Sequence, residues 1–198
     1  MEKSRLERQL EFCLEADKEK KIKRQTLLSD GKTNEDDAQH AWHMALMCLL
    51  LGEYSNEEID LLKTVTMILI HDIVEIDAGD TYAYDDESKK TQQEREIKAA
   101  KRLFGILPDD QAERFKALWE EFEAGTTPEA RFAHTMDNIQ PAMLNCATDG
   151  KKWAEHKVRL TQILKRNAHT ADGSKALWDY SLNNFIMPSV QKGRIINE

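Results

Sequence analysis

Apolar residues recur at helical spacing along most of this chain, and this periodicity is the feature that most restricts its fold. Leu6, Leu10 and Leu14 follow one another every four positions, as on one face of a helix. The segment 36–51, with its run DAQHAWHMALMCLLL, predicts a largely buried helix that ends at Gly52. No stretch alternates apolar and polar residues as a half-buried strand would. The sequence therefore predicts an all-α fold of about seven or eight helices.

The helical pattern also predicts how the chain is divided. The first helix should end near Lys20, and a capping box of Ser55 and Glu58 should precede the helix that carries His71. After the polar run AYDDESKK at 83–90, helices are predicted over 91–104, 109–124, 128–148, 151–168 and 174–187. Thr127 and Pro128 have the form of a helix cap followed by a first-turn proline.

The length favours a single unit. At 198 residues the chain is expected to form one domain over 1–198, with a core at about 6–145. The C-terminal helices, within 151–190, are expected to pack on that core.

Charge and cysteine content restrict the partners and the compartment. The formal net charge is −8 and only KEKKIKR at 18–24 is rich in basic residues, so no nucleic-acid polymer is expected as a partner. The N-terminal MEKSRLERQLEF has no apolar signal core, and no apolar run approaches membrane-spanning length. Cys13, Cys48 and Cys146 are far apart and lie among apolar or helical neighbours, which predicts reduced, buried thiols. A cytoplasmic protein without a membrane partner is expected.

Ionisable residues follow directly on an apolar helix in the stretch TVTMILIHDIVEIDAGD, which runs from Thr64 to Asp80. A carboxylate in apolar surroundings must be paired, protonated or bound to a metal. Potential ligands also occur in two other apolar helices, His40 in AQHAWHMA and Asp137 in FAHTMDNIQPAML. Imidazoles and carboxylates around one divalent cation would satisfy all of these groups together, and such mixed ligands admit Mn, Co, Fe, Ni, Zn or Mg.

The order of these residues resembles a known signature. A lone His, an adjacent His-Asp pair and a distal Asp are similar to the H…HD…D pattern of HD-domain metal-dependent phosphohydrolases. HDIVEIDAGD resembles the HD-x-x-E-x-x-x-G-D string of one branch, which holds the deoxyribonucleoside 5'-monophosphate nucleotidases and the HD domain-containing protein 2-like proteins. AQHAWHMA and LWEEFEAGTTPEARFAHTMDN resemble the segments that carry the branch's first His and distal Asp.

The resemblance implies an enzyme that hydrolyses the 5'-phosphate from nucleoside monophosphates, in particular deoxyribonucleoside monophosphates. It implies one divalent metal ion held by His40, His71, Asp72 and Asp137, catalytic roles for Glu75 and Asp80, and substrate binding by Arg24 and Asp80. Glu75 would orient or deprotonate a water molecule, and Asp80 would protonate the leaving ribose oxygen or hold a sugar hydroxyl. The planar guanidinium of Arg24 suits a phosphate. One metal and one arginine, with no glycine-rich phosphate loop, favour monophosphates over di- and triphosphates.

Two other functions remain open at this point. The chain could hydrolyse another phosphate compound, or it could be a catalytically silent metal-binding module. Glu75 and Asp80 argue against silence, because a purely structural site would need only the ligands. Members of the branch tend to be dimers, so a homodimer is expected, with Trp178, Phe185 and Ile186 as exposed apolar residues that would suit its interface.

The chain departs from the branch pattern at Gln39, where relatives usually carry a Glu before the first histidine. Gln39 is expected to be a neutral hydrogen-bonding partner of the metal site. The segment between residues 24 and 40 reads as a loop. Pro141 removes one hydrogen bond from the helix predicted at 128–148, so this helix should kink close to Asp137 or break just after it.

Overall fold

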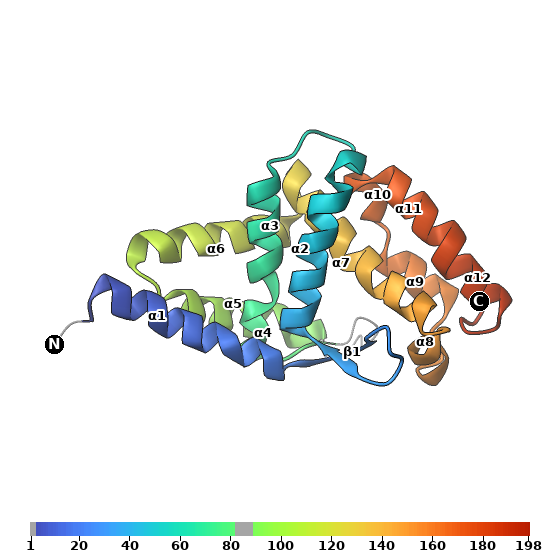
Figure 1. Ribbon diagram of the computed structural model, residues 1–198, viewed down its shortest axis with the longest axis horizontal. Coiled ribbons are helices and arrows are strands. Elements are labelled where there is room, and N and C mark those ends of the chain that lie inside the picture. Colours follow the sequence, from blue (N-terminus) through green and yellow to red (C-terminus); the bar gives the residue numbers. More distant parts are fainter. Residues whose placement is uncertain (1–2, 82–88) are drawn as a thin grey trace.

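The computed structural model describes residues 3–81 and 89–198, and helices make up most of that length (Figure 1). The α-helices are α1 (Arg5–Ala16), α2 (Asp37–Leu51), α3 (Leu61–Ile70), α4 (Glu75–Ala78), α5 (Lys89–Phe104), α6 (Asp109–Ala124), α7 (Pro128–Ala147), α8 (Lys151–Glu155), α9 (Leu160–Arg166), α10 (Thr170–Gly173), α11 (Lys175–Ser181) and α12 (Met187–Gln191). The 3₁₀ segments η1 (Asp17–Lys21), η2 (Gly52–Tyr54) and η3 (His71–Val74) and the π segment η4 (Leu182–Ile186) join them. The predicted all-α class is confirmed.

The helices are shorter and more numerous than the sequence predicted. The helix expected at 151–168 is divided into α8 and α9, and Lys157 between them has a left-handed backbone with φ of 52°. The helix expected at 174–187 is divided among α11, η4 and α12. The expected polar break at 83–90 lies almost entirely outside the described residues.

A short antiparallel hairpin replaces the loop that was expected after the first helix. β1 (Lys23–Leu27) pairs with β2 (Asn34–Asp36), and an irregularity interrupts their register. The turn is closed by Asp30, whose carboxylate accepts hydrogen bonds from the backbone N–H groups of Lys32 and Thr33 at 2.8 and 2.9 Å. This hairpin ends at Asp36, directly before α2, and so fixes Arg24, on β1, beside the start of that helix.

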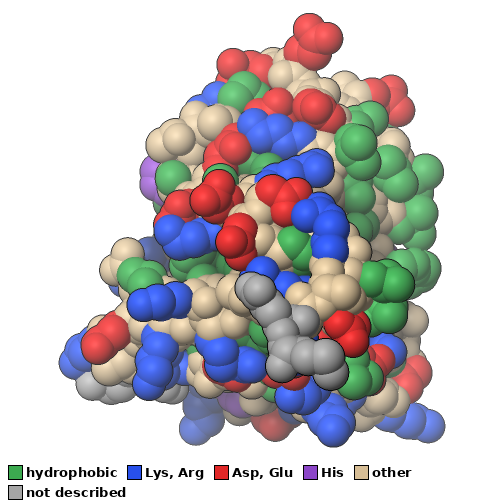
Figure 2. Space-filling view, turned by 90° about the vertical axis from the view of Figure 1, so that its left-hand side faces the viewer, with side chains coloured by type: hydrophobic (Ala, Val, Ile, Leu, Met, Phe, Trp, Pro, Cys, Tyr) green, Lys and Arg blue, Asp and Glu red, His purple; other side chains and the backbone are tan. Residues whose placement is uncertain are grey.

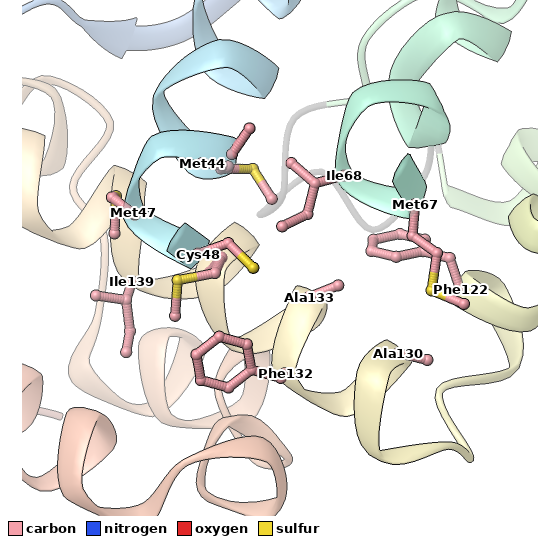
Figure 3. Close-up of a cluster of buried hydrophobic side chains, with 12 residues drawn as sticks. Met44, Met47, Cys48, Met67, Ile68, Phe122, Ala130, Phe132, Ala133 and Ile139 are labelled. Carbon is pink, nitrogen blue, oxygen red and sulfur yellow. The ribbon is translucent and has the colours of Figure 1, made fainter. Parts of the chain in front are cut away.

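The main core lies between α2, α3 and α7, which carry the densest apolar sequence. Figure 1 shows α2 and α3 side by side, and both pack against α7. In Figure 3 their side chains point toward one another. The buried set includes Met44 and Cys48 of α2, Met67 and Ile68 of α3, and Phe132 and Met136 of α7. Packing these three helices together brings their polar residues together as well.

The ends of the helices show which capping predictions hold. The Thr127 hydroxyl accepts a hydrogen bond from the N–H of Ala130 at 3.3 Å, and Pro128 opens α7, as predicted. Helix α7 continues through Pro141, so a break after Asp137 does not occur. The predicted capping box before α3 is wrong, because the cap is Asp60, which accepts from the N–H of Lys63 at 3.0 Å.

The C-terminal helices pack against α7 and close a smaller apolar cluster. Its buried members are Ala142, Trp153, Val158, Ile163, Ile186 and Ile195. Ile186 is 0% exposed, and Trp178 and Phe185 are partly buried, so the expectation that these three residues form an exposed apolar surface is wrong. They are used to attach the last helices to the rest of the molecule.

The cysteines are free, as predicted, but they are not all buried. Cys48 is buried and Cys146 is half-buried, whereas Cys13 is exposed on α1. Within the part of the chain that the structure describes, no helix has both the length and the apolar character needed to cross a bilayer.

Candidate metal centre

Three of the four predicted ligands lie in one buried cluster. His40 comes from the first turn of α2, and His71 and Asp72 open the 3₁₀ segment η3 that follows α3. One ligand atom from each of these residues lies within 4.8 Å of the other two, and all three residues are buried. The sequence separates His40 from His71 by a whole helical hairpin, and the packing of α2 on α3 removes that separation.

His71 has its ring orientation fixed by the end of the helix that carries it. Its Nδ1–H donates to the carbonyl oxygen of Ile68 at 2.7 Å, so in the neutral ring Nε2 carries the lone pair. That Nε2 is buried without a hydrogen-bond partner in the described residues and lies 3.1 Å from Oδ1 of Asp72. Two lone-pair atoms this close repel each other unless a cation lies near both, so the pair is suited to a metal.

His40 has the same arrangement. Its Nδ1–H donates to the side-chain oxygen of Gln140 at 3.1 Å, while its Nε2 lies 3.2 Å from Oδ1 of Asp137. Gln140 in turn donates to the buried carboxylate of Glu35 at 2.5 Å, so its amide orientation is determined. Hydrogen bonds of this kind fix the tautomer and direction of metal-binding histidines. Asp137, the fourth predicted ligand, thus joins the cluster through His40.

The electrostatics of the cluster favour ionised carboxylates beside a positive charge. Burial alone would raise the pKa of Asp72, but His71 and Arg24 hold it well below its usual range. Burial likewise opposes ionisation of Asp137, and Arg166 and His40 keep its pKa low. Burial lowers the pKa of His71, yet the charges of Asp72 and Asp137 raise it to about 9. A cation is therefore stabilised here, whether it is a proton or a metal.

The residues present consequently fit a divalent cation. Mixed nitrogen and oxygen ligands are a common set for such ions. The Nε2 atom of His71, which has no hydrogen-bond partner among the described residues, is available as a metal ligand within the cluster. The donor set of this cluster is therefore consistent with the metal that the sequence pattern predicts.

Glu75 and Asp80 lie in the same cavity as the cluster. Glu75 opens α4 directly after η3 and is buried; burial, then the charges of Asp72 and Asp37, raise its pKa well above the usual range. Helix α4 ends at Gly79, whose φ of 76° is readily adopted only without a side chain. The chain turns there, and Asp80 lines the cavity. Burial raises the pKa of Asp80 as well.

Arg24 reaches the cluster from β1. Its Nη1 donates to Oδ2 of Asp72 at 2.8 Å and to Oδ1 of Asp37 at 3.0 Å. Its Nε lies 4.0 Å from Glu35, so three carboxylates surround the guanidinium. Arg24 is therefore held firmly beside one of the predicted metal ligands.

The cavity has a volume of about 240 Å³. Its described lining includes Arg24, Asp72, Glu75, Asp80 and Asp137, together with residues from α5, α6 and the C-terminal helices. Six of the seven predicted site residues line this cavity, and the seventh, His40, is buried and is not among the described lining residues.

Several residues at the site were not predicted. Asp37 and Glu35 come from a polar run that reads as a loop, yet both are buried beside Arg24. Arg166 pairs with Asp137 from α9, with no sequence signal except its charge. The role expected for Gln39 is wrong, because its side chain accepts from the N–H of Asp36 at 3.1 Å and so caps α2. The amide side chain that hydrogen-bonds to the ring of His40 is that of Gln140, and not that of Gln39.

Comparison with known proteins agrees with this geometry. The model of the HD domain family matches residues 16–178. A zebrafish (Danio rerio) protein named 5'-deoxynucleotidase HDDC2 is 31% identical over 110 residues, which are 55% of this chain and 53% of the relative. A protein of the same name from Dictyostelium discoideum is 30% identical over 138 residues, 66% of this chain and 72% of the relative.

A solved structure covers nearly the whole chain. It is described as a predicted metal-dependent phosphohydrolase from Magnetospirillum magnetotacticum MS-1, with a TM-score of 0.92 and 45% identity over 98% of this chain and 96% of that one. The chain spans about half the length of the vertebrate relatives that it matches. The family match over most of the chain, together with the cluster of His40, His71 and Asp72, shows that this protein belongs to the HD domain family.

Proposed function

We propose that this protein is a metal-dependent phosphohydrolase that removes the 5'-phosphate from nucleoside monophosphates, in particular deoxyribonucleoside monophosphates. The observation that carries the proposal is the cluster of His40, His71 and Asp72 beside a cavity that also contains Arg24 and Glu75. The relatives named 5'-deoxynucleotidase and the neighbour described as a metal-dependent phosphohydrolase support the same reaction.

His40, His71, Asp72 and Asp137 would hold one divalent cation. Both histidines direct Nε2 toward the cluster, and both carboxylates stay ionised because positive groups lie beside them. When bound, such a cation lowers the pKa of a water molecule and withdraws charge from a phosphate. These donors admit Mn, Co, Fe, Ni, Zn or Mg.

The other site residues would act on water and substrate. Glu75, which directly follows the segment that holds His71 and Asp72, accepts a proton as the water oxygen bonds to phosphorus. The bond from phosphorus to the ribose oxygen breaks in the same reaction, and Asp80 either protonates that oxygen or holds a sugar hydroxyl. Arg24 binds the phosphate and holds Asp72 in place. The products are a nucleoside and inorganic phosphate.

We propose a small substrate and not a nucleic-acid polymer, and the charges on one face of the molecule support this. On the face drawn in Figure 2, Lys and Arg side chains are interspersed with Asp and Glu and do not gather into a broad basic area. Binding a polymer would need such an area, because phosphate contacts supply most of the affinity. A cytoplasmic location is part of the proposal, since free thiols persist in a reducing compartment.

A phosphate-release screen tests the proposed function. The metal-loaded protein is incubated with nucleoside mono-, di- and triphosphates of both sugar series, and with simple organic phosphates, in the presence of Mn²⁺, Co²⁺ or Mg²⁺. We expect release from monophosphates to be fastest, because the cavity is acidic and tolerates few added charges. Faster release from triphosphates or from non-nucleotide phosphates would favour another hydrolase activity. No release from any compound would favour a silent metal-binding module.

We also propose that the protein forms a homodimer through α2 and α3. Along one face of α2 and on the exposed side of α3, large apolar side chains are exposed to solvent: Trp42, Leu46, Leu49, Leu50, Leu62 and Leu69. Four of them recur on α2 at helical spacing, and the two helices lie side by side. Contiguous apolar surfaces of this kind often mark protein interfaces.

Replacing Leu49 by lysine is expected to convert a dimer into a monomer, because it would place a charge in an apolar interface. The measurement is molar mass by light scattering after size-exclusion chromatography. Leu14→Lys on α1 is the matched control, since Leu14 is also exposed but lies on another helix. A monomeric wild-type protein, or a dimer that Leu49→Lys leaves intact, would exclude this interface.

A further inference from the structure

Arg166, the last residue of α9, brings a guanidinium into the cavity from the C-terminal part of the chain. Its Nη2 donates to Oδ2 of Asp137 at 2.8 Å. Among the described residues that line the cavity, the lysines and arginines are Arg24 and Arg166. Arg24 contacts Asp72 and Arg166 contacts Asp137, so one guanidinium lies beside each of two predicted metal ligands.

The two arginines differ in how much of the guanidinium is free. The Arg24 side chain is 14% exposed and lies among Glu35, Asp37 and Asp72. The Arg166 side chain is 37% exposed, and Asp137 is the carboxylate with which it pairs in the described structure. A guanidinium has five N–H donors in a planar fork. Arg166 can therefore keep its bond to Asp137 and still offer donors to an anion in the cavity.

The acidic lining of the cavity favours a second cationic side chain at the substrate site. Six carboxyl groups line its described part, those of Asp72, Glu75, Asp80, Glu96, Glu123 and Asp137. A phosphate monoester carries up to two negative charges, and the ionised carboxylates of this lining, Asp72 and Asp137 first, repel it. Arg24 is already shared among carboxylates, so its charge is largely compensated before the substrate enters. Arg166 is the other cationic side chain in the described lining that can offset this repulsion.

We propose that Arg166 is a substrate-binding residue that holds the phosphate group of the nucleotide together with Arg24. The inference rests on the proposed function and extends it, because the C-terminal helices would then complete the substrate site. Bidentate binding by a guanidinium matches the geometry of a phosphate. Asp137, which accepts from Arg166, would keep the fork directed into the cavity.

The test compares Arg166→Ala, Arg166→Lys and the control Lys165→Ala. Lys165 is the preceding residue on the same helix, is exposed, and is absent from the described lining, so the control removes an equal charge outside the cavity. Each protein is loaded with Mn²⁺, its metal content is measured, and KM and kcat are determined with deoxyadenosine 5'-monophosphate. Binding of inorganic phosphate to the same proteins is measured by calorimetry.

Arg166→Ala should raise KM and weaken phosphate binding by about 10- to 100-fold, since a hydrogen bond to a charged group is lost. Arg166→Lys should fall between Arg166→Ala and the wild type, because it keeps the charge and loses the fork. Lys165→Ala should match the wild type. If Arg166→Ala loses its metal, the comparison with the wild type is made with Arg166→Lys, provided that this variant keeps its metal.

Unchanged KM and unchanged phosphate binding in metal-loaded Arg166→Ala or Arg166→Lys would overturn the inference. An equal loss in Lys165→Ala would also overturn it, because the effect would then be one of net charge. The calorimetry needs no turnover. Weakened phosphate binding therefore supports the role of Arg166 even if the screen finds no nucleotidase activity, and failure of the proposed function can be recognised separately.

Discussion

Replacing His71 by alanine is expected to abolish binding of the divalent cation and, with it, any phosphate release. The variant removes the Nε2 that lies 3.1 Å from Asp72 and has no hydrogen-bond partner in the described structure. Asp72→Ala should have the same effect, because it removes the carboxylate of the pair. Loss of a group beside a ligand already costs 10- to 100-fold in affinity, roughly, and loss of a ligand should cost more.

Metal content and thermal stability measure this effect without an activity assay. A cation at about 100 times its Kd stabilises the folded state by about 2.7 kcal/mol. For a chain of this size that corresponds to a rise in Tm of roughly 5 to 10 °C. We expect the wild type to show this rise with Mn²⁺, and His71→Ala to show none.

The matched control is His134→Ala. His134 also lines the cavity, but its Nε2–H donates to the carbonyl oxygen of Phe122 at 2.7 Å, and it is not part of the cluster of His40, His71 and Asp72. This variant should bind Mn²⁺ as the wild type does, with circular dichroism showing that both variants fold. A His71→Ala protein with full metal content would refute the proposed coordination.

The site residues around His71 could be predicted from the sequence because they lie close together in one local pattern. His71, Asp72 and Glu75 are separated by less than two helical turns, and an apolar helix precedes them. The signal is that ionisable residues directly follow an apolar, buried helix, and this can be seen within one short stretch of the sequence. The cap at Thr127 is local in the same way, since it needs only the proline that follows.

The contacts that complete the site could not be predicted, because they join distant segments. The resemblance assigns Arg24 to the substrate but does not indicate its contact with Asp72, and Arg166 reads as an ordinary surface charge. Their carboxylate partners are 48 and 29 residues away in the sequence, and only the tertiary structure brings them together. The hairpin of β1 and β2 has no apolar alternation, so its pairing depends on the helices against which it packs. For the same reason Ile186 reads as exposed and is buried by residues from α7, α8 and α9.

Replacing Glu75 by glutamine should separate metal binding from chemistry. The amide has nearly the shape of the carboxyl group but cannot accept a proton from water. We therefore expect kcat to fall by about 10²- to 10⁴-fold, the range for loss of a general base, with little change in KM. Metal content should stay at the wild-type level, because Glu75 is not among the proposed ligands and the His40, His71 and Asp72 cluster is left intact.

The matched control is Glu123→Gln, which neutralises another carboxyl group in the lining of the same cavity. Burial raises the pKa of Glu123 to about 7, so both substitutions remove an acid whose pKa is raised by burial. Only Glu75 directly follows the segment that holds His71 and Asp72, so Glu123→Gln should change kcat by a small factor. Equal losses in the two variants would mean that the charge of the cavity, and not proton transfer, governs the rate. A Glu75→Gln protein that loses its metal would instead place Glu75 among the ligands.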